Sequence, residues 1–257
     1  MYAVILAGGK IEPENELFTE SKGRPKSMIS VGGKPMIQWV IDAAARAKPV
    51  ERIVIVGLDA ISTLSSEKPV AHIPDHGGIF ENLAAAVALI LKEVPGSEYF
   101  LSISADIPLV TPAIIEAVIA RDHEPGIDVF YNVVGQTVME KAFPGVKRTY
   151  MRFRDGRYCG ADMHVMGTKA IQKLIDLGFV QFRKHPFKLI KRVGFDSVLR
   201  MLIFPPTLAT AGKVVSRRSG IIGYPVACEY PEIAMDIDTL QHLRIVREKL
   251  AQHIDHE

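Results

Sequence analysis

The sequence has 257 residues, of which 48% are hydrophobic and 23% are charged, a balance that suits one large packed domain. No apolar run reaches the roughly 18 residues of a membrane-spanning helix, and the N-terminus lacks the basic segment and cleavage site of a signal peptide. The two cysteines, Cys159 and Cys228, do not have metal-ligand spacing. We therefore expect a protein of the reducing cytoplasm.

Strands and helices alternate over the first half of the chain. Short β-branched apolar runs predict buried strands, and apolar residues at helical spacing predict helices. The expected elements are a strand at Tyr2–Ala7, a helix at Pro35–Lys48, a strand at Arg52–Gly57, a helix at Glu81–Val94, a strand at Tyr99–Ser104, a helix capped by Thr111 and a strand at Asp128–Val134. This alternation predicts an α/β fold with a mostly parallel sheet and helices on both faces.

The second half of the chain has a less regular pattern. A turn at Asp155-Gly156 predicts a hairpin between strands at Thr149–Phe153 and Tyr158–Met166. The elements expected after it are helices at Thr168–Leu177, Pro186–Phe204 and Thr207–Arg218, a strand at Ile221–Glu229 and a closing helix at Thr239–Ile254.

The formal net charge of +2 is unevenly distributed along the chain. Nine Lys and Arg residues, against the single acidic residue Asp196, lie between Gln181 and Arg218. We expect one domain spanning residues 1–257, with a basic helical insertion at residues 180–220. The basic charge has three possible roles, namely a solvated face, a site for a phosphorylated molecule, or a membrane-surface contact through residues 183–204, which we do not favour.

A glycine pair follows the first expected strand in the segment LAGGK, Leu6–Lys10. Glycine permits a sharp turn and leaves backbone N–H groups open to an anion. Ligands of open α/β sheets bind where the strands end, although a plain tight turn explains the pair alone equally well. The spacings GxxxxGK[ST] and GxGxxG are absent, so neither a P-loop nor a dinucleotide fingerprint is present.

Charged residues follow this loop and two later elements. Arg24, Lys26 and Lys34 lie in GRPKSMISVGGKPMIQWVIDAA, residues 23–44. Asp106 follows a strand in SISADIPLVTP, where a carboxylate can hold a divalent metal. It could also cap the next helix, but Thr111 is the better cap. The segment EIAMDIDTLQHL, residues 232–243, adds Asp236 and Asp238, and Asp238 could equally cap the closing helix.

These segments, in this order, resemble the nucleotidyltransferase superfamily that includes the MobA-like NTP transferases and the sugar-1-phosphate nucleotidyltransferases. The resemblance covers nearly the whole chain except about residues 180–220. It implies a Rossmann-like, GT-A-like fold with a mostly parallel mixed sheet. It also implies Mg²⁺ or Mn²⁺ on Asp106 and Asp238, with Asp236 a weaker candidate. Lys26 is then catalytic, and the nucleotide is bound by Leu6, Ala7, Gly8, Gly9, Lys26, Gly77, Gly78, Asn82 and Asp106.

Two of these assignments depend on less specific segments. The segment DHGGIFENLAAAV, residues 75–87, gives Gly77, Gly78 and Asn82 their nucleotide role, and a plain loop-to-helix boundary explains it equally well. The segment CGADMHVMG, residues 159–167, stands where the family binds its acceptor. Its acceptor-binding candidates are Asp162, at a position where Asn is more usual, and Gly160.

One departure from the family pattern concerns an arginine. Family members usually carry Gly-x-x-Arg directly after the glycine pair, whereas here residues 10–23 separate Gly9 from Arg24. This segment contains four glutamates, which repel a triphosphate. Arg24 is then the candidate for the missing catalytic guanidinium.

The function implied is transfer of a nucleoside monophosphate from an NTP to a small phosphorylated acceptor (a sugar phosphate or cofactor precursor), with release of pyrophosphate. A non-catalytic nucleotide-binding regulator and a nucleotide-sugar glycosyltransferase on the same fold remain alternatives. No GxSxG elbow supports a serine hydrolase, and no aromatic–basic interleaving supports nucleic-acid binding. A homo-oligomer is possible.

Overall fold

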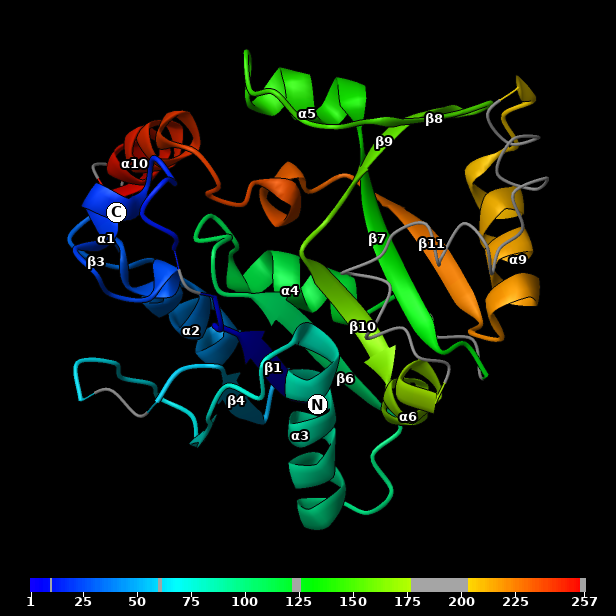
Figure 1. Cartoon of the computed structure of the whole chain (residues 1–257), viewed down its shortest axis with the longest axis horizontal. Helices are drawn as coiled ribbons and strands as arrows, with labels where there is room; N and C mark the ends of the chain where they lie inside the picture. Colours follow the sequence, from blue (N-terminus) through cyan, green and yellow to red (C-terminus); the bar gives the residue numbers. More distant parts are fainter. Residues whose placement is uncertain (10, 60–61, 122–125, 177–202, 255–257) are drawn as a thin grey trace.

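The computed structural model describes residues 1–9, 11–59, 62–121, 126–176 and 203–254. Within these ranges a nine-stranded mixed sheet forms the centre, and helices cover both of its faces (Figure 1). None of the helices in the described ranges combines the length and the apolar character that a bilayer span requires.

The sheet has a parallel half and a mixed half. Its strands run in the order β5-β4-β1-β6-β10-β7-β9-β8, and β11 pairs with β7. The pairs among β5, β4, β1 and β6 are parallel, as is β7 with β11, whereas β9 and β10 run against their neighbours. The bounds are β1 Tyr2–Leu6, β4 Arg52–Val56, β5 Val70–Ile73, β6 Tyr99–Ser104, β7 Val129–Gly135, β8 Met151–Phe153, β9 Gly156–Gly160, β10 Met163–Gly167 and β11 Gly223–Cys228.

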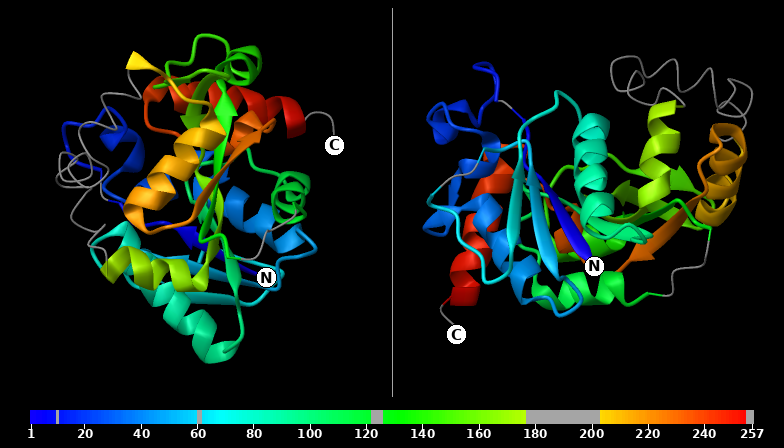
Figure 2. Two further views of the ribbon diagram at one scale, coloured as in Figure 1. Left: turned by 90° about the vertical axis from the view of Figure 1, so that its right-hand side faces the viewer. Right: turned by 90° about the horizontal axis from the view of Figure 1, so that it is seen from below.

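The helices divide between two hydrophobic cores, one on each face of the sheet. Helices α2, α4, α5 and α10 pack into one core and α3 and α6 into the other. The right-hand view of Figure 2 shows α2 and α10 on one side of the sheet and α3 and α6 on the other. The bounds are α2 Met36–Arg46, α3 Ile79–Glu93, α4 Pro112–Ile119, α5 Gln136–Ala142, α6 Thr168–Asp176 and α10 Leu240–Ile254. Shorter elements are α1 Phe18–Ser21, the 3₁₀ turns η1 Lys26–Met28 and η3 Pro231–Ala234, and the hairpin of β2 Ser30–Val31 with β3 Lys34–Pro35.

Strand β1 shows why the first half of the fold follows from its sequence. Ala3 and Ile5 belong to one core, and Tyr2 and Val4 belong to the other. A strand buried on both faces carries a continuous apolar run, which is typical of parallel sheets. The expected strands and helices of this half are confirmed to within a few residues, and the Thr111 hydroxyl accepts the amide of Ile114 at the start of α4 (3.3 Å).

The second half confirms the hairpin at Asp155-Gly156 but corrects one strand. The single strand expected at Tyr158–Met166 is wrong, because the chain breaks at Ala161-Asp162 into β9 and β10. Both segments pair with β7, β9 beside Val133–Gly135 and β10 beside Val129 and Phe130, whereas β9 also pairs with β8 and β10 also pairs with β6. Local hydrophobic pattern carries no information about such a break within a strand. Strand β5 and helix α5 were not predicted.

The expected basic insertion is described only in part. Most of the expected helix Pro186–Phe204, and most of the segment 183–204 with it, lies outside the described residues. The helix expected at Thr207–Arg218 is confirmed as α9, Leu208–Ser219. Helix α9 packs against β11, where the Ser216 hydroxyl donates to the carbonyl of Gly223 (3.2 Å) and accepts from its amide (2.9 Å). This part of the basic region therefore covers the edge of the sheet.

Two glycines bring β1 and β4 close together at the edge where the strands end. Gly57 has φ +88°, and a Cβ there would lie 2.4 Å from the backbone nitrogen of Gly8. A side chain at Gly57 would therefore meet both a strained backbone conformation and a backbone atom that cannot rotate away. The position requires glycine so that the loop after β1 can turn beside β4.

We predict that Gly57→Ala destabilises the protein by about 2–5 kcal/mol, since the strain of a left-handed backbone adds to steric overlap. Gly33→Ala is the matched control. Gly33 has φ +84° with open space around its would-be Cβ, so it should show only the backbone penalty of about 1–2 kcal/mol. Urea unfolding of both variants measures the difference. Equal losses in the two variants would contradict the close approach.

Candidate active site

The glycine loop meets a second loop beyond the ends of β4 and β5. A Cβ at Gly8 would lie 3.3 Å from Asn82 Nδ2 and 3.4 Å from Asp75 Oδ1. Asn82 is buried; it accepts the amide of His76 at 2.7 Å and donates to Asp75 Oδ1 at 2.9 Å. Asn82 thus shapes the loop before α3, at whose N-terminus Gly78 is the capping residue. The structure brings together Gly8 and Asn82, which the sequence analysis placed on the nucleotide.

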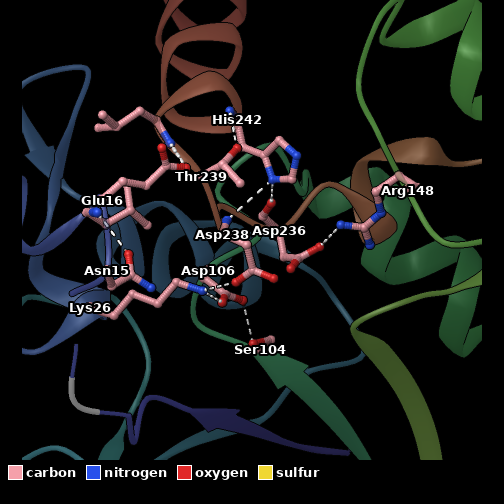
Figure 3. A network of polar contacts seen from close by, with 12 residues as sticks. Asn15, Glu16, Lys26, Ser104, Asp106, Arg148, Asp236, Asp238, Thr239 and His242 are labelled. Atoms are coloured by element: carbon pink, nitrogen blue, oxygen red, sulfur yellow. Dashed lines mark hydrogen bonds and ion pairs between the residues drawn. The ribbon is translucent and has the colours of Figure 1, made fainter. Parts of the chain in front are cut away.

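The other predicted residues converge beside this loop, as Figure 3 shows. The ammonium nitrogen of Lys26 lies 2.6 Å from Asp106 Oδ2 and 2.6 Å from Asp238 Oδ1. Asp236 joins them, because one carboxylate oxygen from each of Asp106, Asp236 and Asp238 lies within 4.8 Å of the others. Residues separated by up to 212 positions along the chain therefore form one charged cluster.

Backbone contacts fix this cluster at the ends of the central strands. The amide of Ala105 donates to the carbonyl of Leu6 (3.0 Å), which aligns the exit of β6 with the exit of β1. The amide of Ile237 donates to the carbonyl of Asp106 (3.0 Å), so the C-terminal acidic pair is attached to the same point. The Ser104 hydroxyl also orients Asp106 by donating to its Oδ1 at 2.6 Å.

Two residues that the sequence analysis missed support the C-terminal acids. Arg148, which lies between α5 and β8, forms an ion pair with Asp236, and both side chains are only 13% exposed. His242 of α10 lies with Nδ1 3.0 Å from the carbonyl oxygen of Asp236 and 3.3 Å from the amide of Asp238. Arg148 lies in no recognisable motif, so no signal in one sequence could have identified it.

The balance of charge in the cluster is negative. Asp106, Asp162, Asp236 and Asp238 supply four carboxylates, against the cations Lys26 and Arg148. Burial together with the neighbouring charges of Asp236 and Asp106 raises the pKa of Asp162 from 3.8 to about 8, although Arg148 opposes this rise. Asp162 therefore mostly keeps its proton at neutral pH, and the carboxylates of Asp106, Asp236 and Asp238 face the two cations Lys26 and Arg148.

Lys26 and Asp238 respond to each other's charge. Burial opposes the charged form of Lys26, but Asp106 and Asp238 outweigh it and raise the pKa of the ammonium group. Burial likewise opposes the charged form of Asp238, yet the hydrogen bond from Lys26 leaves its pKa below the ordinary value. Both groups are therefore ionised at neutral pH.

Other predicted residues occupy less central positions. The backbone at Gly9 has φ +138° and open space around it, which leaves room for a ligand beside the loop. Arg24 is exposed to solvent and is not among the groups that contact the acidic cluster in the described ranges. Gly160 lies in β9, where a Cβ would be 2.5 Å from the hydroxyl of Tyr131, and the Tyr131 ring stacks on His164 at 4.5 Å.

A cavity of about 730 Å³ lies away from the cluster, between α2, the start of α4 and α10. Its lining includes Trp39, Phe143 and Tyr230 but none of the four site carboxylates. We place the candidate active site by its converging charges, because transfer of a phosphoryl-type group depends on positioning and charge neutralisation.

Comparison with known proteins identifies the family of this chain. A model of the MobA-like NTP transferase domain matches residues 3–221. The chain belongs to this family, as its motifs suggested.

Individual relatives are similar to this chain to different extents. A 3-deoxy-manno-octulosonate cytidylyltransferase of Vibrio campbellii is 29% identical over 114 residues, or 43% of this chain and 44% of that protein. The chain thus matches less than half the length of this curated relative. A hypothetical transferase of Thermus thermophilus has a solved structure that is 30% identical with a TM-score of 0.79, and the match covers 94% of this chain and 98% of that one.

A more distant structure shows the same fold. It is a CMP:2-keto-3-deoxy-manno-octonic acid synthetase complexed with CTP, 16% identical with a TM-score of 0.56, over 98% of this chain and all of that one. The expected GT-A-like, Rossmann-like fold is thereby confirmed.

The raised pKa of Asp162 has a consequence for folding stability. Between its ordinary value of 3.8 and its folded value of about 8, the native state binds a proton that the unfolded state has lost. We therefore predict that, without divalent ions, this group lowers the free energy of unfolding by on the order of 1 kcal/mol per pH unit as pH rises from 5 to 8. Asp162→Asn should remove this dependence.

Urea unfolding at several pH values, in the presence of a chelator, measures the effect. Asp59→Asn, at an exposed position, controls for the loss of one acidic group. If the difference in the free energy of unfolding between wild type and Asp162→Asn did not change with pH, the pKa of Asp162 would not be raised in the folded protein.

Proposed function

We propose that this protein transfers a nucleoside monophosphate from an NTP to a small phosphorylated acceptor and releases pyrophosphate, with the help of a divalent cation. One observation carries the proposal: Lys26 meets both Asp106 and Asp238 at 2.6 Å, beside the glycine loop. This arrangement offers backbone N–H groups and an ammonium group to a triphosphate, and carboxylates to a metal, at one edge of the sheet.

The residues present fit Mg²⁺ or Mn²⁺. All the ligands on offer are carboxylate oxygens, which suit hard divalent cations, and the surplus of negative charge calls for a cation. Asp106 and Asp238 would hold the ion, with Asp236 close enough to share it. Such an ion, when bound, supplies neutralisation of the phosphate charges.

Lys26 has two tasks in this proposal. Without ligands its ammonium group neutralises Asp106 and Asp238. With nucleotide bound, the group turns toward the phosphates and stabilises the negative charge that develops there. In the reaction an acceptor oxygen forms a bond to the α-phosphorus as the bond from the α-phosphorus to the bridging oxygen breaks, and pyrophosphate leaves with that electron pair. Arg24, exposed nearby in the sequence, is the second candidate for contact with the phosphates.

The acceptor would bind on the side of β9 and β10. Asp162 lies between these strands, and Gly160 and the stacked pair Tyr131–His164 are close to it. We propose CTP as the first nucleotide to test, because the curated relatives are named as cytidylyltransferases and one structure of similar fold is a CTP complex.

The decisive experiment has two stages. Thermal unfolding with ATP, GTP, CTP or UTP and Mg²⁺ identifies the nucleotide, since a ligand at 100 times its Kd adds about 2.7 kcal/mol of stability. Pyrophosphate release is then measured with sugar phosphates and cofactor precursors. Binding without turnover across the acceptors would favour a regulatory protein. Release of nucleoside diphosphate from a nucleotide-sugar would favour a glycosyltransferase.

We predict that Lys26→Ala lowers kcat/KM by about two to three orders of magnitude, because loss of one preorganised charge contact costs about 2.7–4 kcal/mol in the transition state. Lys92→Ala, on the exposed end of α3, is the control and should keep wild-type activity. An active Lys26→Ala enzyme would remove the catalytic assignment.

Removing the ammonium group should lower activity but strengthen binding of the divalent cation, which Lys26→Met tests. The ammonium group competes with a divalent cation for Asp106 and Asp238, so its removal should strengthen Mg²⁺ binding by about tenfold, since each partly buried ion pair is worth on the order of 1 kcal/mol or more. Isothermal titration with Mg²⁺ measures this, and Asp106→Asn should weaken binding in the same assay. Weaker Mg²⁺ binding by Lys26→Met would place the metal elsewhere.

A further inference from the structure

The acidic segment of residues 11–23 lies between the glycine loop and Lys26 in sequence, yet it contacts the C-terminal helix. The carboxylate of Glu16 accepts the backbone amide of Leu240 (3.0 Å), the first residue of α10 (Figure 3). Glu20 accepts from the guanidinium of Arg247, about two turns further along α10, at 2.7 Å. Two of the four glutamates in this segment are therefore attached to α10.

Glu16 is held by neighbours that are fixed in the fold. Leu17, next in the chain, is 1% exposed and belongs to the core shared with α2 and α10. The Asn15 side chain accepts the amide of Leu17 at 2.8 Å, and Ser21 closes the short helix α1 by donating to the carbonyl of Phe18 at 2.7 Å. The Glu16 carboxylate thus extends from an ordered turn.

The partner of Glu16 is directly connected to a proposed metal ligand. Leu240 follows Asp238 by two residues, and the helix start between them is capped by the Thr239 hydroxyl, which accepts the amide of His242 at 3.1 Å. The Asp238 side chain itself is 61% exposed, so packing does little to hold it. Lys26 holds the Asp238 carboxylate at 2.6 Å, and Glu16 helps to fix the start of α10 beside it by accepting the amide of Leu240.

We propose that Glu16 is a positioning residue that orients Asp238 for the divalent cation by anchoring the N-terminus of α10. The inserted segment then joins the two sides of the site, because it leads into Lys26 at one end and fixes the helix behind Asp238 at the other. The inference rests on the proposed metal site, and it assigns a role to a segment that the family pattern does not explain.

The test compares three variants by Mn²⁺ titration followed by electron paramagnetic resonance. Glu16→Ala should weaken Mn²⁺ binding by about three- to tenfold, the scale of one lost helix cap. Glu16→Gln keeps an oxygen that accepts the same amide and should bind within about twofold of wild type. Glu14→Ala, an exposed acid of the same segment, should match wild type. Mn²⁺ affinity unchanged in Glu16→Ala, or lowered equally in Glu16→Gln, overturns the proposal.

Further readouts separate positioning from general stability. Amide hydrogen exchange at Leu240 should become faster in Glu16→Ala and remain slow in Glu16→Gln. In an activity assay the half-saturating Mg²⁺ concentration should rise, whereas KM for the nucleotide at saturating Mg²⁺ should stay constant; a rise in the nucleotide KM alone overturns the proposal. If Glu16→Ala does not fold, Glu16→Asp keeps the charge but shortens the reach, and wild-type Mn²⁺ binding by that variant overturns the proposal.

The outcomes also distinguish this inference from the proposed function. A wild-type protein that binds Mn²⁺ but releases no pyrophosphate overturns the transferase reaction and leaves the comparison of variants intact. A wild-type protein that is active while Glu16→Ala retains full Mn²⁺ affinity overturns only the positioning role.

Discussion

Four carboxylates gather at one edge of the sheet, and the site depends on how their mutual repulsion is offset. Lys26 compensates Asp106 and Asp238, and Arg148 compensates Asp236. Burial, together with the charges of Asp236 and Asp106, raises the pKa of Asp162 even though the charge of Arg148 opposes the rise. A protein maintains such a cluster at a cost in stability. That cost is understandable if a divalent cation and a polyanionic substrate together complete the balance of charge.

The sheet makes this concentration of charge possible. Parallel strands end at the same edge, so residues that follow β1 and β6 are brought together regardless of their distance in sequence. Backbone hydrogen bonds from Ala105 to Leu6 and from Ile237 to Asp106 then attach three separate segments to one point. Glycine at positions 8 and 57 permits the close approach of β1 and β4 that leaves the edge open to a ligand.

The residue pattern was sufficient for the parallel half of the fold, and the family resemblance correctly predicted that Lys26, Asp106 and Asp238 converge. Lys26, Asp106 and Asp238 each follow a recognisable motif, and the order of these motifs implied that they share one edge. Arg148 could not be found in the same way, because its role arises from contact with Asp236 across 88 residues of chain. The division between β9 and β10 was not predicted for a similar reason, since a break at Ala161-Asp162 within a strand that follows β7 leaves no local periodic signal.

The acidic segment shows how a departure from a family pattern can be explained by physical contacts. Its glutamates repel a triphosphate, so a role on the nucleotide was not expected from charge. The contacts of Glu16 and Glu20 with α10 turn these two charges away from the glycine loop and toward a helix N-terminus and an arginine. An anion is favoured at the N-terminus of a helix, so the same charge that is unfavourable at the phosphates is stabilising where it lies. In the proposed function the insertion would hold the metal side of the site, while the glycines and Lys26 would remain available to the nucleotide.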